Sequence, residues 1–242
     1  MERREPIFNV PAAVVGVLAL LAGVHLLRQV LSPENDAIMV LSLAFIPARY
    51  SGMAADLPGG DLASVTSFLT HALVHADATH LIFNGAWLLA FGGAIARRAG
   101  GARFLAFAAA TAIAGALAFW ALNPGLLAPV VGASGAVAGL MGGTMRFLFR
   151  ALDRGGLRDL RENPGNIPLM SLADTLRDRR VLLSASVFLL LNVLAMYGIG
   201  TGGAQGPIAW EAHIGGYLAG LFGYGFFDRP GRRAEVGGEP SH

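Results

Sequence analysis

Four polar side chains stand inside stretches of sequence that are otherwise apolar. They are Ser134, in the run Gly-Ala-Ser-Gly; His213, in the run Ala-His-Ile-Gly-Gly; and His80 and Asn84, which stand four residues apart and share one face of a helix. A serine hydroxyl becomes a nucleophile when a hydrogen-bonded base removes its proton, and histidine is the usual base near neutral pH. The oxyanion that follows needs donors, and the side chains of His80 and Asn84 and the backbone at Gly132 and Ser134 are candidates. Together these groups can perform acyl transfer.

Other nucleophiles and orienting groups are scarce. The chain has no cysteine, which excludes a thiol nucleophile and a disulfide framework. Glu211 precedes His213 by two residues and therefore projects from a different face of that helix. No other carboxylate is well placed to orient the ring, so the predicted catalytic unit is a dyad of Ser134 and His213.

The composition requires that membrane helices position these residues. The 242 residues have a mean hydropathy of +0.56 and only 14% charged side chains, against about 25% in a soluble protein. This excludes an ordinary soluble domain. The 33 glycines are small enough to let membrane helices approach closely. We expect this packing role for Gly135, Gly139, Gly216 and Gly220.

Stretches without charged residues predict six membrane-spanning helices. Because a bilayer crossing takes about 20 apolar residues, we place these helices at residues 7–31, 79–96, 104–122, 127–146, 181–197 and 210–227. The sequence Asn123-Pro124-Gly125 divides the longest stretch into two helices. The runs 37–48 and 62–76 are too short to cross, and we expect them to lie in the interface or to re-enter between helices. The fold class is an all-α membrane protein, with one six-helix domain over residues 1–227 and a disordered cytoplasmic tail over residues 228–242.

The distribution of arginine predicts the orientation. All but Arg28 and Arg49 of the 18 basic residues lie before the first predicted helix, between the second and third, between the fourth and fifth, or after the last. By the positive-inside rule, the N- and C-termini are cytoplasmic. The second, fourth and sixth helices then begin on the outer side, so His80, Ser134 and His213 share one depth near that surface.

The motifs resemble those of the rhomboid family of intramembrane serine proteases. His80 and Asn84 match the family's H-x-x-x-N, Ser134 matches its G-x-S-G, and the run from Ala212 to Gly220 matches its A-H-x-x-G-x-x-x-G. The predicted helix count and the cytoplasmic termini are also similar to the family's bacterial core. The resemblance covers about residues 7–227.

This resemblance implies a function. It implies cleavage of single-pass transmembrane proteins near the outer end of their helix, with Ser134 as nucleophile and His213 as general base, and with no metal or organic cofactor. Phe83 matches a position that lines the family's substrate route between the second and fifth helices. The expected partners are transmembrane substrates and membrane lipid, without nucleic acid, and the expected location is the bacterial inner membrane.

Two positions depart from the family pattern. The first outer loop carries Ala48-Arg49-Tyr50 where the family often has Trp-Arg. The position four residues after the serine is often aromatic in the family and packs on the catalytic imidazole, but here it is Ala138. Tyr217 is a candidate to pack on the ring of His213 instead.

Other functions are open to the same sequence. A catalytically inactive relative could use the bundle to bind or escort transmembrane helices, although such relatives are expected to lack the serine or the histidine. His71 and His75, with His80 and Asp77 nearby, could hold a metal, but we expect the first two to cap and hydrogen-bond the outer loop. The arginine-rich segment 146–180 could bind acidic lipid or nucleic acid, but its interleaved carboxylates favour a role in topology. A transporter or channel is disfavoured by the scarcity of polar residues in the odd-numbered helices.

Overall fold

The computed structural model describes residues 10–52, 56–162, 164–198 and 208–228, and their regular secondary structure is helical. They contain no β-strand beyond one isolated bridge between Phe45 and Val130. The helices are α1 (Ala12–Val30), α2 (Pro33–Leu43), α3 (Gly60–Thr70), α4 (Ala78–Trp87), α5 (Gly93–Ala99), α6 (Gly101–Leu122), α7 (Ser134–Met145), α8 (Leu148–Arg154), α9 (Gly156–Glu162), α10 (Leu172–Arg177), α11 (Arg179–Met196) and α12 (Trp210–Gly223). A π-helical turn, Leu88–Gly92, joins α4 to α5.

Four helical segments are long and apolar enough to cross a membrane. They are α1, the continuous run Ala78–Ala99, α6 and α11. Four of the predicted spans correspond to these segments, with ends that differ by a few residues. Together with the family relationship reported below, they make the chain an integral membrane protein. The predicted tail lies outside the described residues, apart from its first residue, Asp228.

The other two predicted spans are shorter in the structure. The span expected at residues 127–146 is reduced to α7, and the one expected at residues 210–227 to α12, with 12 and 14 residues. The chain before α7 is extended because Val130 exchanges backbone hydrogen bonds with Phe45 and because Gly132 has a φ of +118°, which is not helical. The α-helix α12 gives way to a 3₁₀ turn at Tyr224–Phe226. Six crossings and the orientation of the termini therefore stay predictions.

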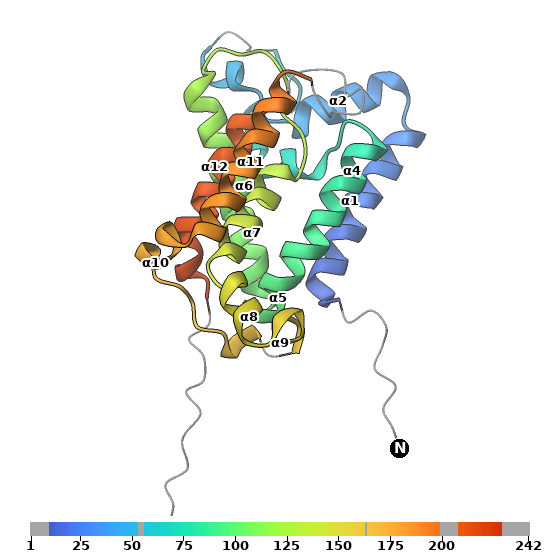
Figure 1. Ribbon diagram of the computed structural model, residues 1–242. Coiled ribbons are helices and arrows are strands. Elements are labelled where there is room, and N and C mark those ends of the chain that lie inside the picture. The colour runs from blue at the N-terminus through green and yellow to red at the C-terminus, as the bar shows by residue number, and fades with distance from the viewer. Residues whose placement is uncertain (1–9, 53–55, 163, 199–207, 229–242) are drawn as a thin grey trace, which may run out of the picture.

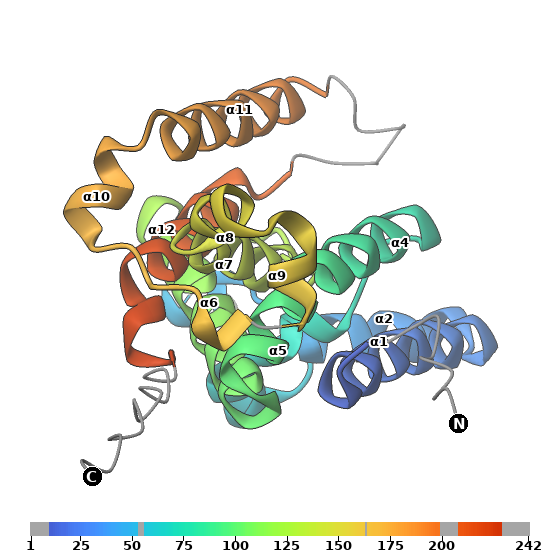
Figure 2. The same ribbon diagram turned by 60° about the horizontal axis from the view of Figure 1, so that its bottom comes forward.

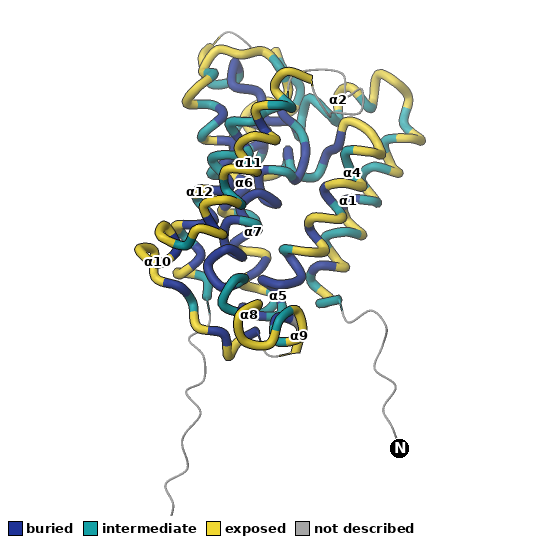
Figure 3. The backbone as a smooth tube through the Cα atoms, viewed as in Figure 1, coloured by how far each residue is buried: buried dark blue, intermediate teal, exposed yellow. Residues whose placement is uncertain are grey.

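The six main helical segments lie side by side. Figure 1 shows α1, α6 and α11 running in one direction between the two ends of the molecule, and the α4–α5 segment, α7 and α12 running in the other. The helix α7 is central, and all of its residues except Ser134 and Met141 are buried. The surfaces of α1, α4 and α11 are largely exposed and apolar, as the tube in Figure 3 shows by its yellow stretches. These are the surfaces that lipid would cover.

Glycine allows α7 and α12 to touch through their backbones. A Cβ atom on Gly216 would overlap the carbonyl oxygen of Gly135, and one on Gly220 would overlap the carbonyl oxygen of Gly139. A Cβ on Gly139 itself would overlap Thr111 of α6. The four glycines singled out in the sequence thus lie where α6, α7 and α12 meet, which is how small residues bring membrane helices together.

Buried and half-buried arginines hold the loops in place at both ends of the bundle. At the end where α1 leads into α2, Arg28 pairs with Asp36 at 2.6 Å and also donates to the carbonyl of His75. At the opposite end, Arg98 pairs with Asp228 at 2.7 Å and donates to two loop carbonyls, while Arg146 donates to the carbonyls of Met170 and Leu221. In the segment between α2 and α3, Arg49 donates to the carbonyls of Leu41 and Pro58. The guanidinium groups donate hydrogen bonds to carbonyls in loops and at helix ends, where no backbone N–H of a helix is available.

Candidate active site

Ser134 and His213 are hydrogen-bonded to each other. Ser134 is the first residue of α7 and His213 lies in the first turn of α12, and both are partly exposed. The distance from Ser134 Oγ to His213 Nε2 is 2.7 Å. This is the distance expected between a nucleophile and the base that activates it. The two helices make a close contact between Gly135, the residue after Ser134, and Gly216, about one turn beyond His213, and this contact holds the two side chains together.

The other ring nitrogen of His213 bonds to a residue on a third helix. His213 Nδ1–H donates to Asn192 Oδ1 at 2.7 Å, and Asn192 Nδ2 donates to the carbonyl of Phe188 at 2.8 Å. This role was not predicted from the sequence, where Asn192 is a single polar residue in an otherwise apolar stretch. The available signal was its position: an amide at membrane depth is costly unless it has a partner.

Two donors converge on a space beside Gly132. A Cβ on this glycine would lie 2.6 Å from His80 Cε1, 2.7 Å from His80 Nε2 and 3.7 Å from Asn84 Nδ2. Asn84 is 5% exposed, and its Nδ2 has no hydrogen-bond partner among the described residues. Ser134 adds a backbone N–H from the first turn of a helix, where such groups lack an intrahelical acceptor. These donors could stabilise an oxyanion formed next to Ser134.

The contribution of Gly132 differs from the expected one. Its N–H donates to the carbonyl of His71 at 2.9 Å, so this donor is already used. The glycine instead leaves room, since any side chain would occupy the space that His80 and Asn84 face. Its positive φ also turns the chain into α7.

His71 and His75 support the turn that leads to Ser134. The ring of His71 donates through Nδ1 to the carbonyl of Ser67 at 2.9 Å, and His75 Nε2 accepts from the N–H of Ala133 at 3.4 Å. Burial lowers the pKa of both imidazoles, and that of His75 falls to about 4. Both rings are therefore neutral at pH 7. The capping residue of α4 is Asp77, which accepts from the N–H of His80 at 2.8 Å, rather than either histidine.

Comparison with known proteins identifies the segment that carries most of this geometry. Residues 62–160 match the family model of the Rhomboid domain. This segment is a rhomboid domain. A protein of Bacillus subtilis (strain 168) named "Putative rhomboid protease YdcA" is 37% identical over 105 residues. The aligned region is 43% of this chain and 51% of that protein, so the chain spans about half the length of the curated relative it matches.

The family relationship predicted from the motifs is confirmed. The matched part of the rhomboid domain contains His80, Asn84 and Ser134, whereas Asn192 and His213 follow it in the chain. The structure brings the later residues to the rhomboid segment through the contact of α12 with α7. No group of three or more metal-binding side chains occurs in the part of the chain that the structure describes.

Phe83 lies on the outer surface of the rhomboid domain. Its side chain projects from α4 and is 62% exposed, as are its neighbours Ile82 and Trp87 to similar extents. The predicted role as a substrate gate requires a position that a transmembrane helix can reach, and an exposed apolar side chain on α4 fulfils this requirement. The gate itself stays a prediction.

Tyr217 and Ala138 lie in the same buried cluster. Ala138 packs with Tyr217 and Leu221. The ring of Tyr217 stacks on Phe188 of α11, with centroids 4.9 Å apart. The partner that the structure gives His213 is therefore Asn192. Glu211, as expected, faces elsewhere and accepts from Asn123 Nδ2 at 3.0 Å.

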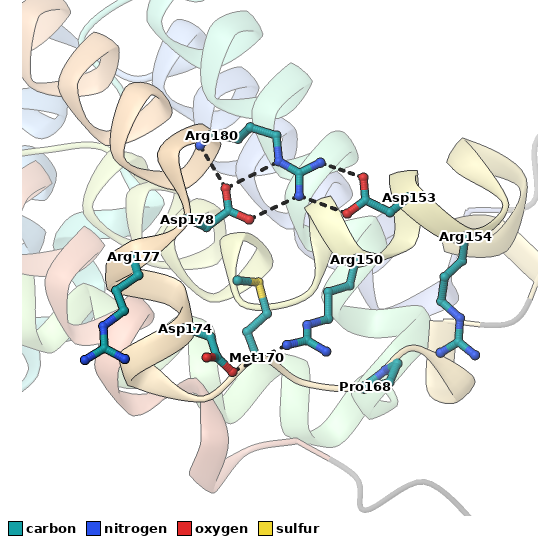
Figure 4. A pocket seen from close by; sticks show the side chains of 9 residues that line it. All are labelled: Arg150, Asp153, Arg154, Pro168, Met170, Asp174, Arg177, Asp178 and Arg180. Atoms are coloured by element: carbon teal, nitrogen blue, oxygen red, sulfur yellow. Dashed lines mark hydrogen bonds and ion pairs between the residues drawn. The ribbon is translucent and has the colours of Figure 1, made fainter.

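A shallow hollow lies at the opposite end of the molecule, between α8, α10 and α11. Figure 4 shows its centre, where Arg180 bonds to both Asp153 and Asp178, while Arg150 reaches Asp174 at 3.4 Å. The side chains that line this hollow are Arg150, Asp153, Arg154, Pro168, Met170, Asp174, Arg177, Asp178 and Arg180. None of them is a nucleophile with an adjacent base. The role of this segment in topology, favoured by the sequence, stays a prediction.

Proposed function

We propose that the chain is an intramembrane serine endopeptidase that cleaves single-pass transmembrane proteins near the outer end of their helix. The observation that carries the proposal is the 2.7 Å hydrogen bond between Ser134 Oγ and His213 Nε2, beside a space faced by His80 and Asn84. A serine that only packs in a membrane helix bonds to a backbone carbonyl one turn earlier. Ser134 Oγ instead bonds to an imidazole nitrogen of His213, which lies on another helix.

The geometry supports a balanced sequence of steps. His213 Nε2 takes the proton from Ser134 Oγ as Oγ attacks the scissile carbonyl carbon, and the carbonyl oxygen becomes an oxyanion facing Asn84. As the C–N bond breaks, Nε2 returns that proton to the leaving amine, which leaves an acyl-enzyme. Water then gives a proton to Nε2 and attacks the ester, and Nε2 finally returns the proton to Ser134 Oγ. No cofactor is needed in any step.

We further propose six crossings with both termini cytoplasmic, in a bacterial inner membrane. The directions of the helices support this, because α7 and α12 run opposite to α1, α6 and α11, although α7 and α12 are each shorter than a full span. Twelve residues of α-helix extend about 18 Å, and the hydrocarbon core is about 30 Å thick. Ser134, at the start of α7, therefore lies below the outer boundary of the membrane. A substrate helix would have to unwind there, and lipid would surround both proteins.

The test is cleavage of a tagged single-pass protein by the purified chain in liposomes. The control variants are Ser134→Ala and His213→Ala. Wild-type cleavage that each variant abolishes is the expected result, because each removes one half of a unit that acts together. Tight binding of the substrate without cleavage by the wild-type chain would favour the escort function instead.

A further inference from the structure

Asn192 is buried on a helix whose surface is otherwise open. Of the 18 residues of α11, only Val181 and Asn192 are buried, and Asn192 is 6% exposed. A buried amide costs free energy unless its polar atoms are hydrogen-bonded. Both atoms of this one are used, one within α11 and one on α12.

These two hydrogen bonds fix the orientation of the amide and the tautomer of the imidazole. The bond from Asn192 Nδ2 to the carbonyl of Phe188 leaves Oδ1 facing His213. A carbonyl oxygen can only accept, so His213 Nδ1 must carry the proton. Its Nε2 is then the unprotonated nitrogen that accepts from Ser134 Oγ. The chain of hydrogen bonds connects α11, α12 and α7.

We infer that Asn192 is the positioning residue of the catalytic base, so that His213 is competent only while α11 is docked on α12. The inference rests on the proposed protease function and deepens it. Without the amide, the ring can rotate, or it can carry its proton on Nε2, where it cannot accept from Ser134. Asn192 itself neither gains nor loses a proton, and its Oδ1 accepts from Nδ1–H before and after Nε2 is protonated.

The contacts between α11 and α12 explain why the base would depend on docking of α11. Figure 2 shows α11 along one side of the bundle, separate from α1 and α4. It reaches α12 through the stacked rings of Phe188 and Tyr217 and, one turn further on, through Asn192 and His213. A displacement of α11 that separates these pairs would remove the acceptor from His213. In this proposal, the position of α11 determines the orientation and the tautomer of the His213 ring.

The first experiment removes the amide. We expect Asn192→Leu, which keeps the size of the side chain, to lower kcat on the order of 10²- to 10⁴-fold, the loss typical of a base with the wrong tautomer, with little change in KM or in thermal stability. Labelling of Ser134 by a water-soluble fluorophosphonate should slow in parallel. The matched control is Ser184→Ala, which removes another side-chain hydrogen bond to a backbone carbonyl of α11 far from His213. Its rate should equal that of the wild-type chain.

The second experiment restores the acceptor. Asn192→Asp should recover activity relative to Asn192→Leu and should move the acid limb of the pH–rate profile to higher pH, because a carboxylate beside Nδ1 favours the protonated ring. A residue that only packs would change the melting temperature and leave the pH profile in place, and this outcome would overturn the inference. So would a wild-type kcat in Asn192→Leu. A wild-type chain that neither cleaves substrate nor reacts with the fluorophosphonate would instead overturn the protease function itself.

Discussion

The ring of His80 packs so closely against Gly132 that residue 132 has no room for a side chain. A Cβ on Gly132 would lie 2.6 Å from His80 Cε1. The space beside Ser134 therefore exists because residue 132 is glycine. The same residue has a φ of +118°, which L side chains rarely adopt. Steric room and backbone conformation thus impose the same requirement on this position.

Gly132→Ala should reduce kcat/KM by at least about 10²-fold, because the methyl group displaces His80 and fills the proposed oxyanion space. Cleavage in liposomes is the measurement. The matched control is Gly156→Ala, which has a φ of +68° but nothing within 4 Å of the added Cβ. Alanine at this position also adopts an unfavourable φ but meets no neighbouring atom. The cleavage rate of Gly156→Ala should therefore equal that of the wild-type chain. Equal rates in the two variants would mean that the space beside Gly132 has no role in the reaction.

Asn84→Ala should lower kcat on the order of 10²-fold and leave KM nearly unchanged, since an oxyanion donor acts only in the transition state. The thermal stability should not fall by the amount usual for a buried polar residue, because Asn84 Nδ2 has no partner among the described residues. Asn84→Asp, which places an acceptor in the same position, should be at least as inactive. An active Asn84→Asp variant would assign Asn84 to packing.

Gly220→Ala should lower both stability and activity. The new methyl group meets the carbonyl of Gly139, so α12 must move away from α7, and such overpacking costs about 1–3 kcal/mol. The movement also separates His213 from Ser134. Gly223→Ala lies three residues further along α12 with nothing within 4 Å and serves as the control. Melting curves in detergent that are the same for both variants would contradict the close backbone contact.

Stability should depend on pH through His75. Burial and the nearby His80, His25 and Arg28 lower the pKa of this imidazole to about 4 from about 6.5. The unfolded chain therefore binds more protons than the folded chain between these values, so the stabilisation is complete above pH 6.5 and is lost as the pH falls toward 4, by up to about 3 kcal/mol. His75→Gln keeps an acceptor for the N–H of Ala133 and should show a weaker dependence of melting temperature on pH. A dependence as steep as that of the wild-type chain would exclude His75 as the cause.

Substrates with helix-breaking residues should be cleaved faster. The backbone carbonyl of a helical substrate is engaged in its own hydrogen bond, and glycine and proline weaken a helix by about 1 and 3 kcal/mol relative to alanine. We expect a substrate with Gly-Ala just beyond the cleaved bond to turn over faster than one with Ala-Ala, and both faster than one with Leu-Leu. The effect should be larger on kcat than on KM. Equal rates in liposomes would show that unwinding is not limiting.

The sequence predicted the parts of the fold that depend on composition. Long apolar runs without charge identified α1, α6 and α11 within a few residues, and the spaced motifs identified Ser134 and His213 as a pair. It did not predict where α7 begins, because that depends on hydrogen bonds between Val130 and Phe45, 85 residues apart in the chain. Nor did it pair Asn192 with His213. Single polar residues on two different helices show nothing of their contact until the helices are packed.

The ion pair between Arg98 and Asp228 has a consequence for biosynthesis. The two residues are 130 positions apart, so the buried guanidinium has no carboxylate until Asp228 has left the ribosome. At about 5 to 20 residues per second, synthesis of the chain from Arg98 to Asp228 takes about 6 to 26 seconds. During that interval Arg98 lacks the carboxylate with which it pairs in the folded protein. We therefore expect this end of the bundle to close late, and a nascent chain interrupted before Asp228 to be more open to quality-control proteases.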